Sequence, residues 1–470
     1  MKNYYLAVDI GASSGRHILA HMQDGIMQLE EIYRFENGMK HVDGKLLWDT
    51  KHLFIEIVNG MKRCKEIGKI PTSMSIDTWA VDYVLLDEND NVLGDTYGYR
   101  DSRTNGMDEK VYEIIPESQL YERTGIQKQI FNTIYQLMAV KEMEPTLLEE
   151  AKTFLMLPDY FQFLLTGNKV SEYTNATSTQ LVSPIKKQWD KELITMLGYP
   201  EDMFLPISLP GTEVGDLLPE VRERVGFNCK VVLCASHDTG SAVMAMPVVE
   251  GNGLYISSGT WSLMGVENEQ AYCDERSRRA NFTNEGGYDY RFRYLKNIMG
   301  LWMIQSVRHE LSDAYSFAEL CDMAEACKDF PSRVDVNDDR FLAPENMMQA
   351  IADYCEKTTQ KTPETVGEYA TVIYQSLAEC YGATVKELEE NTGKYYEAIH
   401  IIGGGSNAAY LNQLTANETG KNVYAGPSEA TAIGNIMAQM IRNGVFVDLK
   451  DARTCVFKSF DVKEFVPQGR

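Results

Sequence analysis

Alternating hydrophobic and polar residues mark much of the first hundred positions as strands joined by tight turns. The alternation predicts strands over 4–10, 17–22, 27–35, 74–87 and 91–99. A helix is expected over about 53–67, and Asp24-Gly25, Asp43-Gly44 and Asn89-Asp90 supply turn residues. The chain therefore opens with a mixed sheet that starts as a meander.

Further along, the spacing of hydrophobic residues changes twice. From about 104 to 167 they return every three or four positions, which predicts helices. A second strand-rich region starts near Val231 and runs through L-Y-I-S-S-G-T-W-S-L-M-G-V. Later helices are expected over 298–310, 317–326 and 364–390, the last with Thr362 as N-cap and Pro363 in its first turn.

The last part of the chain alternates between strands and helices, as in an α/β unit. We expect a strand over 398–402, a glycine turn, a helix over 408–419, a strand over 422–424 and a helix over 429–443.

Residues 6–19 and 254–264 share one pattern, in which a strand, a turn of small polar residues and a second strand follow each other. We interpret the repeat as a duplicated α/β domain, divided near Val248 into 1–247 and 248–470, with a ligand cleft between the halves. A chance likeness between two hairpins is the alternative. The length of 470 residues independently favours two domains, since single cores stop growing at roughly 250–300 residues.

The net charge of the chain limits the kinds of molecule that it is expected to bind. The formal net charge of −23 argues against a nucleic-acid partner, because such contacts need many Lys and Arg side chains. An acidic chain can still bind a nucleotide where backbone N–H groups, a few basic side chains and a metal ion supply local positive charge.

The N-terminal stretch and the cysteines indicate in which cellular compartment the protein is expected. Asp9 stands where a signal peptide needs apolar residues, and no run approaches the roughly 18 apolar residues of a membrane span. The nine cysteines are scattered without a C-x-x-C spacing, which is typical of reduced thiols and gives no reason to expect a zinc site. We therefore expect a cytoplasmic protein without a membrane partner.

The stretch D-I-G-A-S-S-G-R places small residues at the end of an apolar strand. Such residues let the backbone approach an anion, while Ser13, Ser14 and Arg16 can donate hydrogen bonds to phosphate oxygens. Asp9 would then lie beside those oxygens and could hold Mg²⁺ directly or through water. An ordinary hairpin turn is the alternative, and no Walker A loop occurs in the chain.

A second candidate is A-S-H-D-T-G-S-A, directly after the apolar run 231–234. Polar groups at the carboxyl end of a strand face the crevice where α/β proteins bind ligands. Asp238 could accept the proton of a hydroxyl that attacks a phosphoryl group. Alternatively, Asp238 or Thr239 is simply the N-cap of the next helix.

Three weaker candidates remain. Alternation along I-D-T-W-A-V-D-Y puts Asp77 and Trp79 on one face of a strand. An indole beside carboxylates suits the binding of a polyol. A structural Trp with surface aspartates fits the pattern as well. The glycines of I-I-G-G-G-S-N could let a nucleotide base or ribose lie against the turn. Asn297 is expected to start and cap a helix that carries Gln305, and both are structural on this reasoning alone.

Taken together, several motifs resemble the FGGY family of carbohydrate kinases. The resemblance runs in collinear order from about residue 5 to 440. The motifs are D-I-G-A-S-S-G-R, S-I-D-T-W-A-V-D, Y-R-D-S-R-T-N-G, E-Y-T-N-A-T-S-T-Q-L, S-H-D-T, S-S-G-T-W-S-L-M-G, N-E-G-G, K-N-I-M-G-L-W and I-G-G-G-S-N.

The resemblance implies two ribonuclease-H-like domains of the actin/hexokinase-like type, with an active-site cleft between them. The sugar would lie largely on the first domain and adenosine on the second. The implied reaction is ATP-dependent phosphorylation of a small ketose, L-rhamnulose, at O1 with Mg²⁺, by a monomer or homodimer. Rival readings are a kinase for L-fuculose or another ketose and, in a different class, an actin-like or Hsp70-like ATP switch.

By motif correspondence, the resemblance also implies site residues. The phosphates would be handled by Ala12, Ser13, Ser14, Gly15, Arg16 and Thr260, and ATP also by Gln305 and Gly404. The sugar site would comprise Ala80, His237, Asp238, Thr239 and Asn297, with Asp238 as general base. Where the family usually has glycine at position 80, this chain has alanine.

Overall fold

The computed structural model describes residues 2–248, 253–342 and 344–468, which form two compact units. The first unit comprises 1–245, 267–294 and 431–459, and the second comprises 246–266, 295–430 and 460–470. The predicted boundary near Val248 lies close to the first point where the chain passes between units. The later segments 267–294 and 431–459, which join the first unit, were not foreseen from the sequence.

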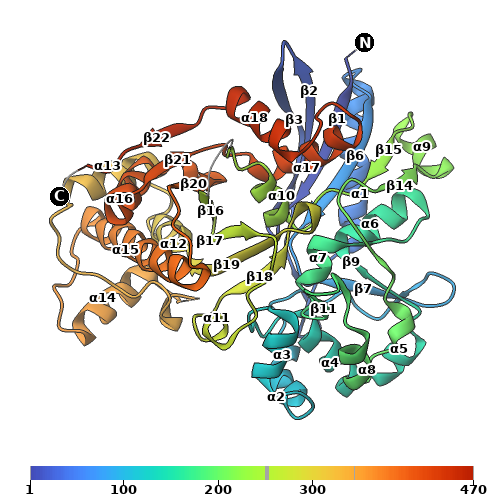
Figure 1. Ribbon diagram of the computed structural model, residues 1–470, viewed down its shortest axis with the longest axis horizontal. Coiled ribbons are helices and arrows are strands. Elements are labelled where there is room, and N and C mark those ends of the chain that lie inside the picture. The colour runs from blue at the N-terminus through green and yellow to red at the C-terminus, as the bar shows by residue number, and fades with distance from the viewer. Residues whose placement is uncertain (1, 249–252, 343, 469–470) are drawn as a thin grey trace. The chain divides into compact units, whose positions relative to one another are not determined.

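The first unit is built on a six-stranded sheet with the order β14-β15-β6-β1-β2-β3 (Figure 1). Its strands are β1 (Tyr4–Ile10), β2 (Ser14–Gln23), β3 (Ile26–Glu36), β6 (Pro71–Thr78), β14 (Glu213–Asp216) and β15 (Lys230–Val232). β1 pairs antiparallel with β2 and parallel with β6. The predicted opening meander is therefore present.

One face of this sheet carries an apolar core. Leu6, Val8 and Ile10 alternate along β1 and are fully buried against helices on that face. The helices that contribute to this core are α1 (Thr50–Glu66), α6 (Leu157–Thr166) and α9 (Pro219–Val225). Alternation along the strands thus decides which side chains enter this core.

The other face of the first sheet is polar although it is buried. Helices α10 (Asp238–Met244), α17 (Ala430–Arg442) and α18 (Leu449–Ser459) belong to this unit. From α17, Gln439 accepts a hydrogen bond from Ser73 Oγ at 2.8 Å and donates to the backbone oxygen of Leu6 at 2.9 Å. Asn435 Nδ2 donates to Asp77 Oδ2 at 2.6 Å. Amide side chains of α17 therefore form hydrogen bonds with polar groups of β1 and β6 on this face.

A glycine allows α17 to approach α10 closely. A Cβ added to Gly434 would lie 1.7 Å from the backbone oxygen of Ser241, so either helix must shift to admit it. Gly434→Ala is expected to lower the free energy of unfolding by about 1–3 kcal/mol, measured by chemical denaturation. The matched change Gly38→Ala, with no atom near the new Cβ, should be close to neutral. Stabilisation by Gly434→Ala, as helix propensity alone predicts, would contradict the close contact.

The remainder of the first unit is a smaller layer with its own core. β7 (Tyr83–Leu86) lies between β8 (Val92–Leu93) and β9 (Thr153–Met156) in a three-stranded sheet. The accompanying helices are α2 (Met107–Tyr112), α3 (Glu117–Thr124), α4 (Thr133–Met143), α5 (Pro145–Glu150), α7 (Tyr173–Thr177) and α8 (Lys191–Met196). The helices expected over 104–167 are present, but β9 among them was not predicted.

The second unit also contains a mixed sheet (Figure 1). Its strand order is β18-β19-β17-β16-β20-β21-β22, where β18 (Thr283–Gly286) is an additional edge strand. The bounds are β16 (Gly253–Ser258), β17 (Trp261–Asn268), β19 (Phe292–Met299), β20 (Ala398–Ile402), β21 (Asn422–Ala425) and β22 (Lys463–Phe465). The helices are α12 (Trp302–Glu310), α13 (Phe317–Ala326), α14 (Met347–Lys357), α15 (Val366–Thr392) and α16 (Ala409–Thr419).

Six strands of the second sheet repeat the topology of the first sheet, and β18 is extra. β14-β15-β6-β1-β2-β3 corresponds strand by strand to β22-β21-β20-β16-β17-β19. In both, the central strand pairs antiparallel with the next strand of the chain and parallel with a later one. The outermost pairs β14–β15 and β21–β22 are both antiparallel. The predicted duplication of an α/β domain is therefore confirmed, and the likeness of the two hairpins is not a coincidence.

Some predicted boundaries are wrong, and local interactions explain why. The helix expected from 298 begins at Trp302, because Ile298 and Met299 belong to β19. The helix expected from 364 begins at Val366, where Thr365 caps it and forms a reciprocal capping box with Glu368. The predicted strand 74–87 is two strands, and that predicted over 91–99 is reduced to β8.

Within the described ranges, no helix is long and apolar enough to cross a membrane.

Candidate active site

The first hairpin holds Asp9 opposite Arg16. These residues are register partners on β1 and β2, and Arg16 Nη2 donates to Asp9 Oδ2 at 2.8 Å. Asn37 fixes the turn, because its backbone N–H donates to Ser13 O at 3.0 Å and its side chain to Gly11 O at 2.8 Å. The stretch is thus a hairpin turn, and it holds an arginine and an aspartate side by side at its base.

The turn residues differ in exposure. Ala12 and Ser14 are half-buried and Ser13 is exposed. Gly15 is required by packing, because an added Cβ would lie 2.1 Å from the ring of Phe35. The small residues predicted to admit phosphate are therefore at the surface of the unit, except at Gly15, where the ring of Phe35 demands glycine.

A group of carboxylates lies near this hairpin. Asp9 and Asp77 are register partners on parallel β1 and β6, and Asp77 is fully buried. Burial first, and then the negative charge of Asp9, raise the pKa of Asp77 well above its usual range. The same two causes raise the pKa of Asp238 to about 6. Asp238 is thereby poised to exchange a proton near neutral pH.

Asp238 stands in the first turn of α10. His237 is the N-cap residue, and it makes no side-chain capping bond, so neither Asp238 nor Thr239 is the N-cap. Asp238 Oδ1 instead accepts from Thr239 N at 2.6 Å and from Thr239 Oγ1 at 3.1 Å. Its side chain keeps 30% of its accessible area, which leaves the carboxylate open to a ligand.

The segment between β15 and α10 is fixed by a buried acid whose role the sequence did not reveal. Glu172 Oε2 accepts from Ser236 N at 3.1 Å and from Ser236 Oγ at 2.7 Å. It also accepts from Thr174 and Asn175, at the start of α7. One carboxylate therefore ties α7 to the residue just before His237. A Glu followed by Thr and Asn was visible in E-Y-T-N-A, but its partner Ser236 was not.

His237 contacts a second pair that was missed, Arg293 and Glu285. Arg293 is fully buried, and its Nη2 lies 3.0 Å from His237 Nδ1. The same Nη2 lies 3.0 Å from Glu285 Oε2. Burial first, and then the charge of Arg293, lower the pKa of His237 well below its usual range. The imidazole is thus neutral at physiological pH.

Ala80 lies in an irregular turn between β6 and β7. Its carbonyl accepts from Asp82 N at 2.9 Å, and the next residue, Val81, has a φ of +67°. A β-branched residue in this region is strained, and such strain clusters at functional sites. Thr133 Oγ1 holds the turn by donating to Val81 O at 2.7 Å.

Trp79 is structural in this turn. Its indole packs against Trp48 with ring centroids 4.1 Å apart, and both indole N–H groups donate to Asp82 Oδ2. Trp79, Asp77 and Asp82 are all buried. The packing of Trp79 fits the alternative of a structural Trp, but the surface aspartates of that alternative are wrong. Burial raises the pKa of Asp82 to about 6.

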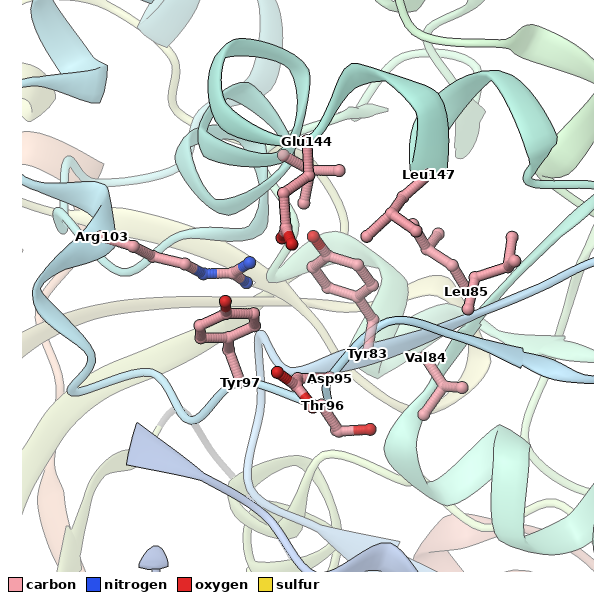
Figure 2. A pocket seen from close by; sticks show the side chains of 11 residues that line it. Tyr83, Val84, Leu85, Asp95, Thr96, Tyr97, Arg103, Glu144 and Leu147 are labelled. Atoms are coloured by element: carbon pink, nitrogen blue, oxygen red, sulfur yellow. The ribbon is translucent and has the colours of Figure 1, made fainter. Parts of the chain in front are cut away.

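A narrow cavity lies behind this turn (Figure 2). Arg103 at its wall donates to Gln136 Oε1 at 3.0 Å, and Gln136 Nε2 donates to Asp82 Oδ1 at 2.9 Å. Figure 2 shows the hydroxyl of Tyr83 pointing toward Glu144. About 20 Å³ is open to the centre of a water molecule, enough for one water. No residue predicted for the site lines this cavity, and the cavity is too small for a sugar.

In the second unit, three predicted nucleotide-binding residues lie around one end of the sheet. Parallel pairing sets Ser257 beside Ile402, so the turn with Thr260 and the turn with Gly404 follow neighbouring strand ends. The start of α12 joins them, since Trp302 N donates to Thr260 O at 3.0 Å. Gln305 follows in the first turn of that helix.

Glycine is needed in this end of the second unit. A Cβ on Gly405 would lie 1.9 Å from Ser258 Oγ, so the glycine turn packs directly on the β16–β17 hairpin.

The remaining predicted residue, Asn297, lies in strand β19, and the prediction that it starts and caps a helix is wrong. A run such as L-K-N-I-M fits both a strand and a helix period, which explains the error.

The donor set fits a magnesium ion that retains much of its water. Within the described ranges, no three His, Cys, Asp or Glu side chains form a group that could enclose a metal ion. Mg²⁺ usually binds through one or two carboxylates plus substrate phosphates. Asp9, beside the hairpin turn, provides one such carboxylate, and its partner Arg16 provides positive charge for phosphate.

Comparisons with known proteins agree on one family. The N-terminal domain of the FGGY family of carbohydrate kinases matches residues 4–245, and its C-terminal domain matches residues 254–442. A protein named rhamnulokinase from Halalkalibacterium halodurans is 52% identical over 468 residues, covering 100% of both chains. Another of that name from Bacillus subtilis is 44% identical, covering 99% of this chain and 95% of its own.

Solved structures share the fold at low sequence identity. A ligand-bound xylulose kinase from Lactobacillus acidophilus has a TM-score of 0.78 at 16% identity, covering 99% of this chain and 94% of its own. A glycerol kinase from Plasmodium falciparum with ADP has a TM-score of 0.77 at 13% identity, covering 100% and 95%. The predicted two-domain α/β architecture is therefore confirmed.

Proposed function

The chain belongs to the FGGY family of carbohydrate kinases, and on that premise we propose that it transfers the γ-phosphoryl group of ATP to O1 of L-rhamnulose. The observation that carries this substrate is the 52% identity, over the full length of both chains, to a protein named rhamnulokinase. Fold similarity at 13–16% identity to other sugar kinases does not distinguish one acceptor from another. The products are L-rhamnulose 1-phosphate and ADP. The enzyme acts in the cytoplasm as a monomer or homodimer.

Asp238 is the general base in this proposal. Its raised pKa, its partly open carboxylate and its place at the start of α10 suit a group that takes the proton of the attacking hydroxyl. Phosphoryl transfer depends mainly on alignment of the reacting groups and on neutralisation of the phosphate charge. The base therefore needs to accept the hydroxyl proton only late in the reaction. Thr239 holds one carboxylate oxygen and leaves the other for the substrate.

The remaining predicted residues divide between sugar and nucleotide. The ketose site is lined by Ala80, His237, Thr239 and Asn297. The ketose adopts a pose that accommodates the methyl group of Ala80. The nucleotide is bound by the residues of the two hairpin turns and of the second unit's strand ends. These are Ala12, Ser13, Ser14, Gly15, Arg16, Thr260, Gln305 and Gly404.

Asp9 and the nucleotide phosphates hold Mg²⁺ in this proposal, which when bound neutralises charge on the phosphates. Arg16 keeps Asp9 in place and adds its own charge on the same side of the hairpin. Exclusion of water is a further requirement, because water competes with the sugar as acceptor.

A panel of ketoses tests the acceptor. With ATP and Mg²⁺ present, ADP release in a coupled assay should be fastest with L-rhamnulose and slow without any sugar. A higher kcat/KM for L-fuculose or another ketose would overturn the proposed substrate but keep the reaction class. Slow ADP release that no ketose increases would favour an ATP switch of the actin-like or Hsp70-like kind over a kinase.

A further inference from the structure

A buried arginine behind His237 has no role in the chemistry described so far. We propose that Arg293 is a positioning residue that fixes His237 as the neutral tautomer with its proton on Nε2. His237 then donates a hydrogen bond on the side of Asp238, so a ketose hydroxyl bound there accepts from His237 while it donates to Asp238. The substrate part of this inference rests on the proposed function, whereas the tautomer itself does not.

The contacts of His237 decide which ring nitrogen carries the proton. Arg293 Nη2 lies 3.0 Å from Nδ1 with its N–H directed at that nitrogen. A guanidinium can only donate, so Nδ1 must be the acceptor. In a neutral imidazole the proton is then on Nε2. Nε2 lies 3.5 Å from Asp238 Oδ1, too far for a good hydrogen bond but close enough for one hydroxyl to contact both groups.

The surroundings of the imidazole together favour a neutral ring, although its two neighbouring acids do not. Asp238 and Glu285 lie 3.5 and 3.4 Å from its two nitrogens, and by themselves they would favour an imidazolium. Arg293 opposes them, and it lies 3.0 Å from Glu285, so much of the charge of that acid is already neutralised. Burial of the ring further disfavours a second proton.

The free-energy cost of burying Arg293 beside His237 indicates a role beyond packing. Its side chain is fully buried, and its Nη1 has no hydrogen-bond partner among the described residues. Leaving a buried donor unpaired costs about 1–3 kcal/mol. Its Nε donates to Gly286 O at 3.0 Å, which fixes the plane of the guanidinium relative to His237. An apolar residue would fill this space without that cost.

Nitrogen-15 NMR of the ligand-free protein tests the tautomer directly. A long-range proton–nitrogen correlation spectrum separates the three states of a histidine, and His237→Gln identifies the signals by their loss. Wild type should show the Nε2–H form from pH 6 to 8. An Nδ1–H form or an imidazolium in wild type would overturn the proposal, whichever sugar the enzyme uses and whether or not variants fold.

Kinetics test the consequence for the ketose. Arg293→Met should lower kcat/KM for the ketose by about 10-fold or more while KM for ATP stays unchanged, because one oriented donor is lost. Arg293→Lys, which keeps a donor and the charge, should recover part of the loss. Arg63→Met, the same change on the exposed face of α1, should leave both constants unchanged.

A double-mutant cycle separates positioning from a general structural effect. If Arg293 acts through His237, Arg293→Met adds no further loss of kcat/KM in a His237→Gln background. Losses that multiply would contradict action through His237. Loss of activity with the Nε2–H tautomer intact in Arg293→Met would contradict it as well.

Discussion

Asp238→Asn is expected to lower kcat for ketose phosphorylation by about 10²- to 10⁴-fold while ATP binding is retained. The amide has nearly the shape of the carboxylate, but it cannot accept the proton of the sugar hydroxyl. Thr239 N can still donate to the amide oxygen, so the start of α10 should persist. ADP release under saturating substrates gives kcat, and calorimetry with a slowly hydrolysed ATP analogue gives nucleotide affinity.

The stability of this variant provides an internal control. Asp238 lies near the buried charges of Asp9 and Asp77, and its raised pKa shows that its ionised form is disfavoured in the fold. Asp238→Asn should therefore not lower the unfolding temperature. Asp43→Asn, the same change in an exposed turn, should leave both activity and stability unchanged. More than about a tenth of wild-type kcat in Asp238→Asn would remove Asp238 as the general base.

Glu172→Gln is expected to lower the free energy of unfolding by about 3 kcal/mol, because its carboxylate is the acceptor for several buried donors. Three of them are backbone N–H groups, of Thr174, Asn175 and Ser236, which cannot turn away. A glutamine keeps one acceptor oxygen and turns its NH₂ group toward the other donors. For a unit of this size the unfolding temperature should fall by about 5 °C, measured by calorimetry.

The same change should reduce catalysis, since Ser236 directly precedes His237 and Asp238. Glu150→Gln on the exposed face of α5 is the matched control and should have little effect on either quantity. An unfolding temperature for Glu172→Gln equal to that of the control would mean that Glu172 is protonated in the fold and does not serve as the shared acceptor.

Much of the fold could be predicted because its strands follow a simple period. β1 and β20 have the predicted bounds, and so does helix α13. The repeated strand-turn-strand pattern at residues 6–19 and 254–264 led to the duplicated domain, which the matched strand orders confirm. Local signals such as alternation and turn residues are sufficient where an element is decided by its own sequence.

The errors have physical causes that a local pattern does not contain. Val81 adopts a positive φ that its type disfavours, and bonds from Thr133 and Gln136 hold it there. The predicted strand 74–87 therefore breaks where distant residues impose a turn. Likewise, the apolar residues around Asn297 fit either period, and their pairing in the sheet selects β19.

The residues of the candidate site also divide into those that the local sequence indicates and those that only tertiary structure brings together. Asp9, Arg16 and Asp238 stood out because polar residues at strand ends are conspicuous in the sequence. Arg293 is 56 residues from His237, and its partner Glu285 lies in a separate motif, so their contact depends on tertiary structure alone. The return of α17 to the first unit, where Asn435 binds Asp77, was hidden for the same reason.

A crystal structure with L-rhamnulose and a slowly hydrolysed ATP analogue tests the central claim most directly. The proposal predicts that a carboxylate oxygen of Asp238 lies about 2.6–3.2 Å from O1 of the ketose, so that it can accept the proton of this hydroxyl. A bound sugar whose O1 contacts another acid, with Asp238 turned to a different hydroxyl or to solvent, would contradict it.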